Sequence, residues 1–240
     1  YLDRSFKIND GLHFARSLLL DLAEMEIPAA TEYLDLISPQ YVADLISWGA
    51  IGARTTESQA HRELASGLSC PVGFKNATDG GLQIAVDSCL SASKPHHFMS
   101  LTKDGHSAIF STTGNPDCHV ILRGGKKPNF DAESINEAAE TIGRSGQPAR
   151  FMVDCSHANS GKSHLQQEVV CQDVIKQIAR GENRIMGLML ESNLVAGRQN
   201  QEPDKELVYG QSITDACMAW ENSETLLHDL AKAVRLRRQK

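Results

Sequence analysis

The stretch Val72 to Leu90, VGFKNATDGGLQIAVDSCL, decides the fold class of this chain. Its first four residues are mostly apolar and end at Lys75. A turn rich in glycine follows, and residues 83–90 then carry apolar side chains at helical spacing. A strand, a turn and a helix in this order form one βα unit, and repetition of such units predicts a parallel sheet with crossover helices.

The same alternation runs through most of the chain. Strands are expected at residues 29–34, 50–54, 72–75, 98–101, 119–122, 151–154 and 185–190. Helices are expected from the Asn9 and Asp10 caps to before Pro28, from Ser38-Pro39 to near Trp48, around 61–65 and 83–90, from 131, and over 166–179 and 221–235. Between residues 102 and 116, turn residues flank Ala108-Ile109-Phe110, which indicates a β-hairpin excursion.

The expected fold is an α/β barrel. Six of these seven expected strands are counted as barrel-type strands, whereas a closed (β/α)8 TIM barrel has eight. The sequence therefore predicts such a barrel without its first two βα units, which are expected to precede Tyr1, and with the hairpin as an insertion. No low-complexity linker interrupts the series, so residues 1–240 are expected to be one catalytic domain, the C-terminal part of that barrel.

Composition excludes several classes of protein. A net charge of −6 and a pI near 5.8 argue against a nucleic-acid partner, because phosphate binding needs clustered Lys and Arg. No apolar run has the roughly 18 residues of a membrane helix, and the first ten residues lack a signal-peptide pattern. Six scattered cysteines form no CxxC pair. These features favour a cytoplasmic protein without a disulfide framework or zinc knuckle.

Chemistry in a barrel of this kind lies at the carboxyl ends of the strands. The expected strand ends and the loops after them offer Glu32, Arg54, Lys75, Arg123, His157 and Glu191, with Asp215 on a later loop. The three cations suit an anionic substrate, because guanidinium and ammonium groups match phosphate and carboxylate oxygens. A single strand-end arginine is more often part of a surface ion pair. Three cations at the ends of strands in one series favour a role in binding an anionic substrate.

His157, Glu191 and Asp215 form a set of imidazole and carboxylates that suits a divalent ion such as manganese, iron, cobalt or zinc. Each also has a simpler interpretation: a satisfied loop histidine, a charge at the rim, and the N-cap of a short helix. No compact metal motif joins the three residues. Spacing alone therefore leaves both interpretations open.

Five segments of the sequence closely resemble one family, the metal-dependent class I 3-deoxy-D-arabino-heptulosonate 7-phosphate (DAHP) synthases, and the resemblance covers essentially the whole chain. These segments are Gly52-Ala53-Arg54-Thr55-Thr56-Glu57-Ser58-Gln59, Pro71-Val72-Gly73-Phe74-Lys75-Asn76, Ile121-Leu122-Arg123-Gly124-Gly125, Asp154-Cys155-Ser156-His157-Ala158-Asn159-Ser160 and Ser212-Ile213-Thr214-Asp215-Ala216-Cys217. The resemblance implies a transferase that condenses phosphoenolpyruvate with D-erythrose 4-phosphate. This reaction opens the shikimate route to aromatic amino acids.

The resemblance also implies roles for individual residues. Arg54, Lys75 and Arg123 would hold phosphoenolpyruvate, and His157, Glu191 and Asp215 would be metal ligands. Lys75, His157 and Glu32 are the expected catalytic residues, with Glu32 orienting water or the phosphoenolpyruvate site. An aromatic amino acid as feedback inhibitor and a homo-oligomer, dimer or tetramer, are further expectations.

Two motifs of the family are absent from residues 1–240: Gly-Pro-Cys-Ser, which carries a cysteine ligand, and Lys-Pro-Arg-Thr, which contacts both substrates. None of the six cysteines fits the first motif. The alternative is therefore an inactive, truncated barrel that binds only phosphate or an aromatic effector. A second rival is the related octulosonate-phosphate synthase, which uses arabinose 5-phosphate; the segments around Arg54 and Asp215 favour the heptulosonate class.

Overall fold

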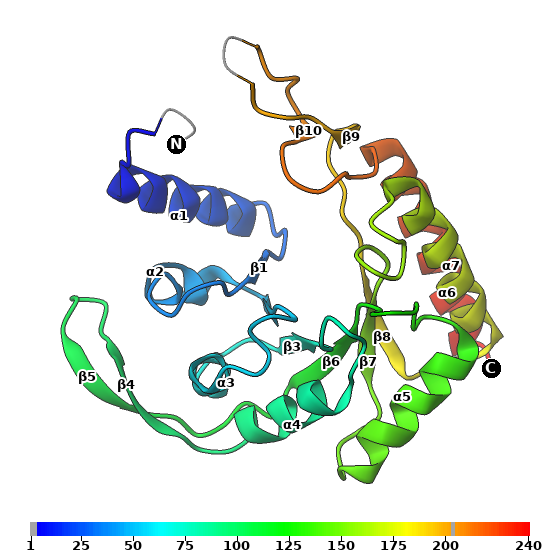
Figure 1. The fold of residues 1–240 in the computed structure, drawn as a ribbon, viewed down its shortest axis with the longest axis horizontal. Coiled ribbons are helices and arrows are strands. Elements are labelled where there is room, and N and C mark those ends of the chain that lie inside the picture. The colour runs from blue at the N-terminus through cyan, green and yellow to red at the C-terminus, as the bar shows by residue number, and fades with distance from the viewer. Residues whose placement is uncertain (1–3, 203–204) are drawn as a thin grey trace. The chain divides into compact units, whose positions relative to one another are not determined.

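Strands and helices alternate along the computed structural model, which describes residues 4–202 and 205–240. The chain forms two compact units. Unit 1 consists of Tyr1–Lys75 and Ile84–His119, and unit 2 of Asn76–Gln83 and Val120–Lys240. Each unit is built from parallel strands with helices between them (Figure 1). The expected α/β class with parallel strands is confirmed.

Unit 1 holds the first three parallel strands. Its elements are α1 (Ile8–Glu24), β1 (Ala30–Glu32), α2 (Pro39–Val42), the 3-10 helix η1 (Ala43–Leu45), β2 (Trp48–Ile51), α3 (Gln59–Ser66), β3 (Val72–Lys75), α4 (Gln83–Ala92), β4 (His97–Leu101) and β5 (Ser107–Ser111). In register, Ala30 of β1 lies opposite Trp48 of β2, and Gly49 of β2 lies opposite Val72 of β3. Every residue of β3 is buried, as expected for a strand covered on both faces.

Unit 2 repeats the arrangement. Its elements are the end of β6 (Cys118–Leu122), α5 (Ala132–Arg144), β7 (Phe151–Asp154), α6 (His164–Arg180), β8 (Ile185–Met189), β9 (Val195–Arg198), β10 (Gln211–Ser212) and α7 (Trp220–Arg238). β7 pairs in parallel with both β6 and β8. α6 and α7 lie side by side (Figure 1). Asp131 caps α5 by accepting the backbone N–H groups of Glu133 and Ser134, and Gly181, with φ 117°, ends α6.

Three local predictions are wrong. Residues 98–101 lie in β4, which pairs antiparallel with β5 in a separate two-stranded sheet, so this strand belongs to the hairpin and not to the βα series. The helix that begins at Pro39 ends well before Trp48, which starts β2. Asn9 and Asp10 lie inside the first turn of α1, whose N-cap position is Lys7 without a side-chain cap. In the described part of the chain, no helix is both long and apolar enough to cross a membrane.

Candidate active site

The three residues predicted as metal ligands come together in unit 2. The side chains of His157, Glu191 and Asp215 each present a ligand atom, and these atoms all lie within 4.8 Å of one another. His157 Nε2 is 3.8 Å from Glu191 Oε1. The fold thus gathers residues from the β7–α6 loop, the segment that follows β8 and the segment between β10 and α7.

The backbone of His157 is held in an uncommon conformation. Its φ is 51°, in the left-handed region that non-glycine residues rarely adopt. The following loop fixes it there, because Lys162 donates its backbone N–H to the His157 carbonyl at 2.7 Å. Asn159 ties the same loop to the sheet by donating its side-chain amide to the carbonyls of Leu122 and Asp154. Strain of this kind is typical of functional positions.

Two buried residues that the sequence did not single out hold the ligands. Asp154 is buried at the end of β7, and its Oδ2 atom is 2.8 Å from Nδ1 of His157. Gln167 of α6 accepts the backbone N–H of Glu191 at 2.8 Å and donates to its carbonyl at 3.4 Å. Asp154 belongs to the quoted segment that contains His157, and its place at a strand end could have indicated a role in the site. No signal in the sequence marks Gln167.

Asp215 lies in a segment without helix, so the interpretation of this residue as the N-cap of a short helix is wrong. Its carboxylate is exposed and shares a small space with the Glu191 carboxylate. Close carboxylates repel unless a proton or a cation lies between them. Imidazole with two carboxylates is a donor set that divalent transition ions accept. The residues present therefore fit a divalent metal ion.

Cys217 is near this group but is not part of it among the described residues. Burial raises the pKa of its thiol, and the charges of Glu191 and Asp215 raise it further.

Two of the three cations predicted to bind the substrate, Lys75 and Arg123, have buried side chains. Lys75 ends β3 in unit 1 and is 5% exposed, and Arg123 directly follows β6 in unit 2 and is 9% exposed. Buried cations are rare unless they have a partner or bind an anion. The Asn76 side chain bonds the backbone of the loop that carries Arg123. Its Oδ1 accepts the Arg123 backbone N–H at 2.8 Å, and its amide donates to the Gly124 carbonyl.

The loop after Arg123 depends on glycine. Gly124 has φ 76°, and a Cβ on Gly125 would lie 2.2 Å from the backbone of Gly80. A side chain at either position would displace the loop that carries Arg123. The pair Gly124-Gly125 is thus required by the packing of two loops in unit 2.

Arg54 and Glu32 lie in unit 1 and both are exposed. Arg54 is in the turn that follows β2, beyond the strand in which it was expected. Glu32 ends β1, and its carboxylate lies against Gly52, where an added Cβ would be 2.2 Å from Oε1. The structure therefore brings Glu32 close to the loop of Arg54.

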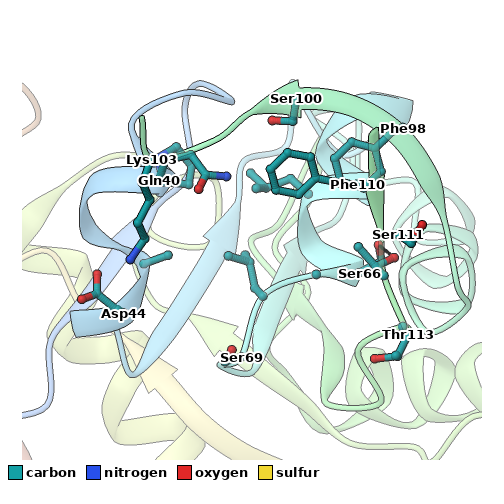
Figure 2. Close-up of a pocket in the computed structure, with 17 residues that line it drawn as sticks. Gln40, Asp44, Ser66, Ser69, Phe98, Ser100, Lys103, Phe110, Ser111 and Thr113 are labelled. Carbon is teal, nitrogen blue, oxygen red and sulfur yellow. Dashed lines mark hydrogen bonds between the residues drawn. The ribbon is translucent and has the colours of Figure 1, made fainter. Parts of the chain in front are cut away.

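Unit 1 also contains a cavity of about 520 Å³. It is lined by α2, η1, the loop after α3 and the β4–β5 hairpin, whose Phe98 and Phe110 rings stack with centroids 6.0 Å apart. Figure 2 shows these rings on one side and Lys103 reaching toward Asp44 on the other. A hydrogen bond from Arg16 lowers the pKa of Asp44 to about 2, so this wall carries a carboxylate that is paired with the Arg16 guanidinium. The cavity thus offers apolar, hydroxyl and charged groups together.

Comparison with known proteins gives consistent matches. The model of the DAHP synthetase I family matches residues 1–228. The chain is 59% identical over 238 residues to the Phe-sensitive phospho-2-dehydro-3-deoxyheptonate aldolase of Escherichia coli, which covers 99% of this chain and 68% of that protein. It is 52% identical over 233 residues to the Trp-sensitive enzyme of Salmonella typhimurium, covering 97% and 67%.

A solved structure shows the same fold. The phospho-2-dehydro-3-deoxyheptonate aldolase from Francisella tularensis superimposes with a TM-score of 0.94 at 54% identity. The match covers 98% of this chain and 69% of that one. The chain thus spans about two thirds of the length of these relatives.

Proposed function

The chain belongs to the DAHP synthetase I family, and from this premise we propose that it condenses phosphoenolpyruvate with D-erythrose 4-phosphate to give DAHP and phosphate, the first step of aromatic amino acid biosynthesis. The observation that carries the proposal is the 59% identity with a named enzyme of this activity over 99% of the chain. The convergence of His157, Glu191 and Asp215 supports it.

In this reaction C3 of phosphoenolpyruvate forms the new bond to the aldehyde carbon, water adds at C2, and phosphate leaves. Lys75 and Arg123 are proposed to bind the phosphate and carboxylate of phosphoenolpyruvate, together with Arg54. Glu32 is proposed to orient water or the phosphoenolpyruvate site. Buried cations are favourable for this purpose because charge-assisted hydrogen bonds are strong where water is excluded.

His157, Glu191 and Asp215 would hold the divalent ion. When bound, manganese, iron, cobalt or zinc supplies a Lewis acid that polarises the aldehyde oxygen. The imidazole and carboxylate donors would keep this charge at one end of the parallel strands of unit 2. The choice among the four ions follows from cellular availability, since the donor set accepts several.

The fold proposed for this chemistry is a single (β/α)8 barrel domain, to which β1–β3 and β6–β8 contribute strands and in which the β4–β5 hairpin is an insertion. The TM-score of 0.94 with a relative supports this fold. The barrel would place Glu32, Lys75, Arg123 and His157, which end their strands or directly follow them, at its catalytic end.

The test is consumption of phosphoenolpyruvate by the purified chain with erythrose 4-phosphate, after chelator treatment and after manganese is restored. We expect turnover that needs metal, that is lost in His157→Gln and that persists in His164→Gln, a matched histidine at the start of α6. Turnover with arabinose 5-phosphate in place of erythrose 4-phosphate would favour the octulosonate enzyme. Metal-loaded protein without turnover would favour the non-catalytic barrel.

We also propose that an aromatic amino acid inhibits the enzyme by binding in the cavity of unit 1. Relatives are named Phe-sensitive and Trp-sensitive, and the cavity combines stacked phenylalanines with charged groups that suit an amino acid backbone. Equilibrium binding of phenylalanine, tyrosine and tryptophan, each measured by calorimetry, would identify the effector. Absence of binding by all three would overturn this assignment.

A homo-oligomer, dimer or tetramer, completes the proposal. Exposed apolar side chains support it: Phe14 of α1 is 71% exposed, and Met99 and Ile109 of the hairpin are 79% and 77% exposed. Met99 and Ile109 lie opposite each other in the β4–β5 pair, and adjacent exposed apolar side chains of this kind are typical of an interface. Light scattering coupled to size exclusion would give the mass of the assembly, and a monomer at working concentration would refute it.

A further inference from the structure

We propose that Asp154 is a positioning residue that fixes His157 as the imidazole tautomer with its proton on Nδ1, so that Nε2 presents a lone pair to the metal centre. The inference deepens the proposed function, on which it rests. Asp154 would act through His157 and would not itself touch the ion or the substrate.

The hydrogen bonds around Asp154 dictate the position of the proton. Asp154 is 0% exposed, and its Oδ1 accepts the Ser156 backbone N–H at 2.9 Å and the Ser156 hydroxyl at 2.5 Å. A hydroxyl has one proton, so Ser156 Oγ can only accept on its other side. His157 Nδ1 therefore faces two acceptors: its hydrogen bond is to Ser156 Oγ at 2.7 Å, and Asp154 Oδ2 lies at ion-pair distance, 2.8 Å away. A nitrogen between two acceptors carries the proton.

This tautomer matches what a metal centre needs. With the proton on Nδ1, Nε2 is unprotonated and directed to the space shared with Glu191 and Asp215. The left-handed backbone of His157 and the bond from Lys162 fix the other end of the residue. Metal-binding histidines commonly donate their second nitrogen to a carboxylate, which sets the tautomer and makes the ligand more basic. The site is thus ordered before an ion arrives.

A purely structural role of Asp154 makes a different prediction. If the carboxylate served only to close the turn after β7, asparagine would replace it, because asparagine Oδ1 can accept both bonds from Ser156. The asparagine amide, however, would present a donor to His157 Nδ1. It would then favour the tautomer with the proton on Nε2, where it blocks the lone pair.

The experiment is nitrogen NMR of the metal-free chain labelled at histidine, with His157→Gln to assign the signal. We expect the Nδ1–H tautomer for His157 in the wild type and the Nε2–H tautomer in Asp154→Asn. Manganese binding, measured from the free-ion resonance signal, should weaken about 10- to 100-fold in Asp154→Asn. Asp173→Asn is the matched control, because this α6 carboxylate of unit 2 accepts a hydrogen bond from Gln177 and, within the described chain, none from His157 or Ser156. It should change neither quantity.

An Nε2–H tautomer in the wild type would overturn the inference, as would an Asp154→Asn variant with the Nδ1–H tautomer and unchanged manganese affinity. Should Asp154→Asn not fold, Ser156→Ala decides: Asp154 Oδ2 remains, so Nδ1–H must persist, and its loss would assign the role to Ser156. A wild type with Nδ1–H but without manganese binding would refute the proposed metal function and leave control of the tautomer by Asp154 in place.

Discussion

Lys75 is a buried cation at the end of a strand, and its proposed ligand is an anion. We expect Lys75→Met to raise the KM for phosphoenolpyruvate about 10- to 100-fold, because a hydrogen bond to a charged group contributes about 1.5–3 kcal/mol. Steady-state kinetics with varied phosphoenolpyruvate would measure it. Lys94→Met, at an exposed lysine of the same unit, is the control. An unchanged KM in Lys75→Met would exclude this residue from the binding site.

Two glycines of unit 2 should respond in opposite ways to alanine. Gly125→Ala would place a methyl group 2.2 Å from the Gly80 backbone and should lower the free energy of unfolding by about 1–3 kcal/mol or more. Gly143→Ala, inside α5 with no atom within 4 Å of the new methyl, should raise it by about 0.5–1 kcal/mol. Urea unfolding measures both. Equal changes in the free energy of unfolding for the two variants would show that the loop near Arg123 can move to accommodate the added methyl group.

The charged residues of the candidate site could be predicted from the sequence, because they lie at or after the carboxyl ends of strands, where the active sites of barrel enzymes are found. His157, Glu191 and Asp215 were proposed in this way, and the structure brings them together. The sequence could have indicated Asp154 by its place at a strand end, but the roles of Asp154 and Gln167 depend on which group lies opposite each side chain after packing.

At the scale of elements, one ion pair fastens α1 to the segment before β2. Arg16 of α1 forms two hydrogen bonds to the Asp44 carboxylate at 2.9 and 2.8 Å. This partner lowers the pKa of Asp44 from 3.8 to about 2. A depressed carboxyl pKa stabilises the fold above the unfolded pKa, and the contribution is lost as pH falls through the folded one.

We therefore expect the stabilisation of α1 to be constant above about pH 5 and to disappear between about pH 4 and pH 2. The measurement is the urea midpoint of the wild type and of Asp44→Asn at several pH values. The two proteins should differ at neutral pH and converge near pH 2. A difference that persists there would show that Asp44 acts through shape and not through charge, and the contribution should also fall with added salt.

Strands with a clear apolar pattern were predicted with the correct bounds. Elements whose type or length depends on pairing with another strand were not. The buried strands 72–75 and 151–154 have the bounds expected from their apolar runs. Residues 98–101 read like another such strand, but alternation of exposed and half-buried residues fits the hairpin that they form with β5. The helix from Pro39 is short because Trp48 and Gly49 enter β2, a pairing that local propensity does not encode.

At the scale of the molecule, sequence pattern and resemblance were sufficient for the class of fold and for the reaction. Parallel pairing of β1 with β2 and of β7 with both its neighbours follows from strands separated by helices. The position of the cavity in unit 1, the proposed effector site, was not predicted from the sequence. Its walls come from α2, the end of α3 and the hairpin, which are close only in the folded unit 1.

The hairpin offers a sharp test of this cavity, because neighbouring residues of β4 face opposite sides of the ribbon. Phe98 lines the cavity and stacks on Phe110, whereas Met99 is 79% exposed on the other face. Phe98→Ala should raise the concentration of aromatic amino acid that halves DAHP synthesis about tenfold, since a lost aromatic contact is worth up to about 1.5 kcal/mol. Met99→Ala should leave it unchanged. The uninhibited rate should be the same in both variants, and a shift in Met99→Ala alone would place the effector on the outer face of the hairpin.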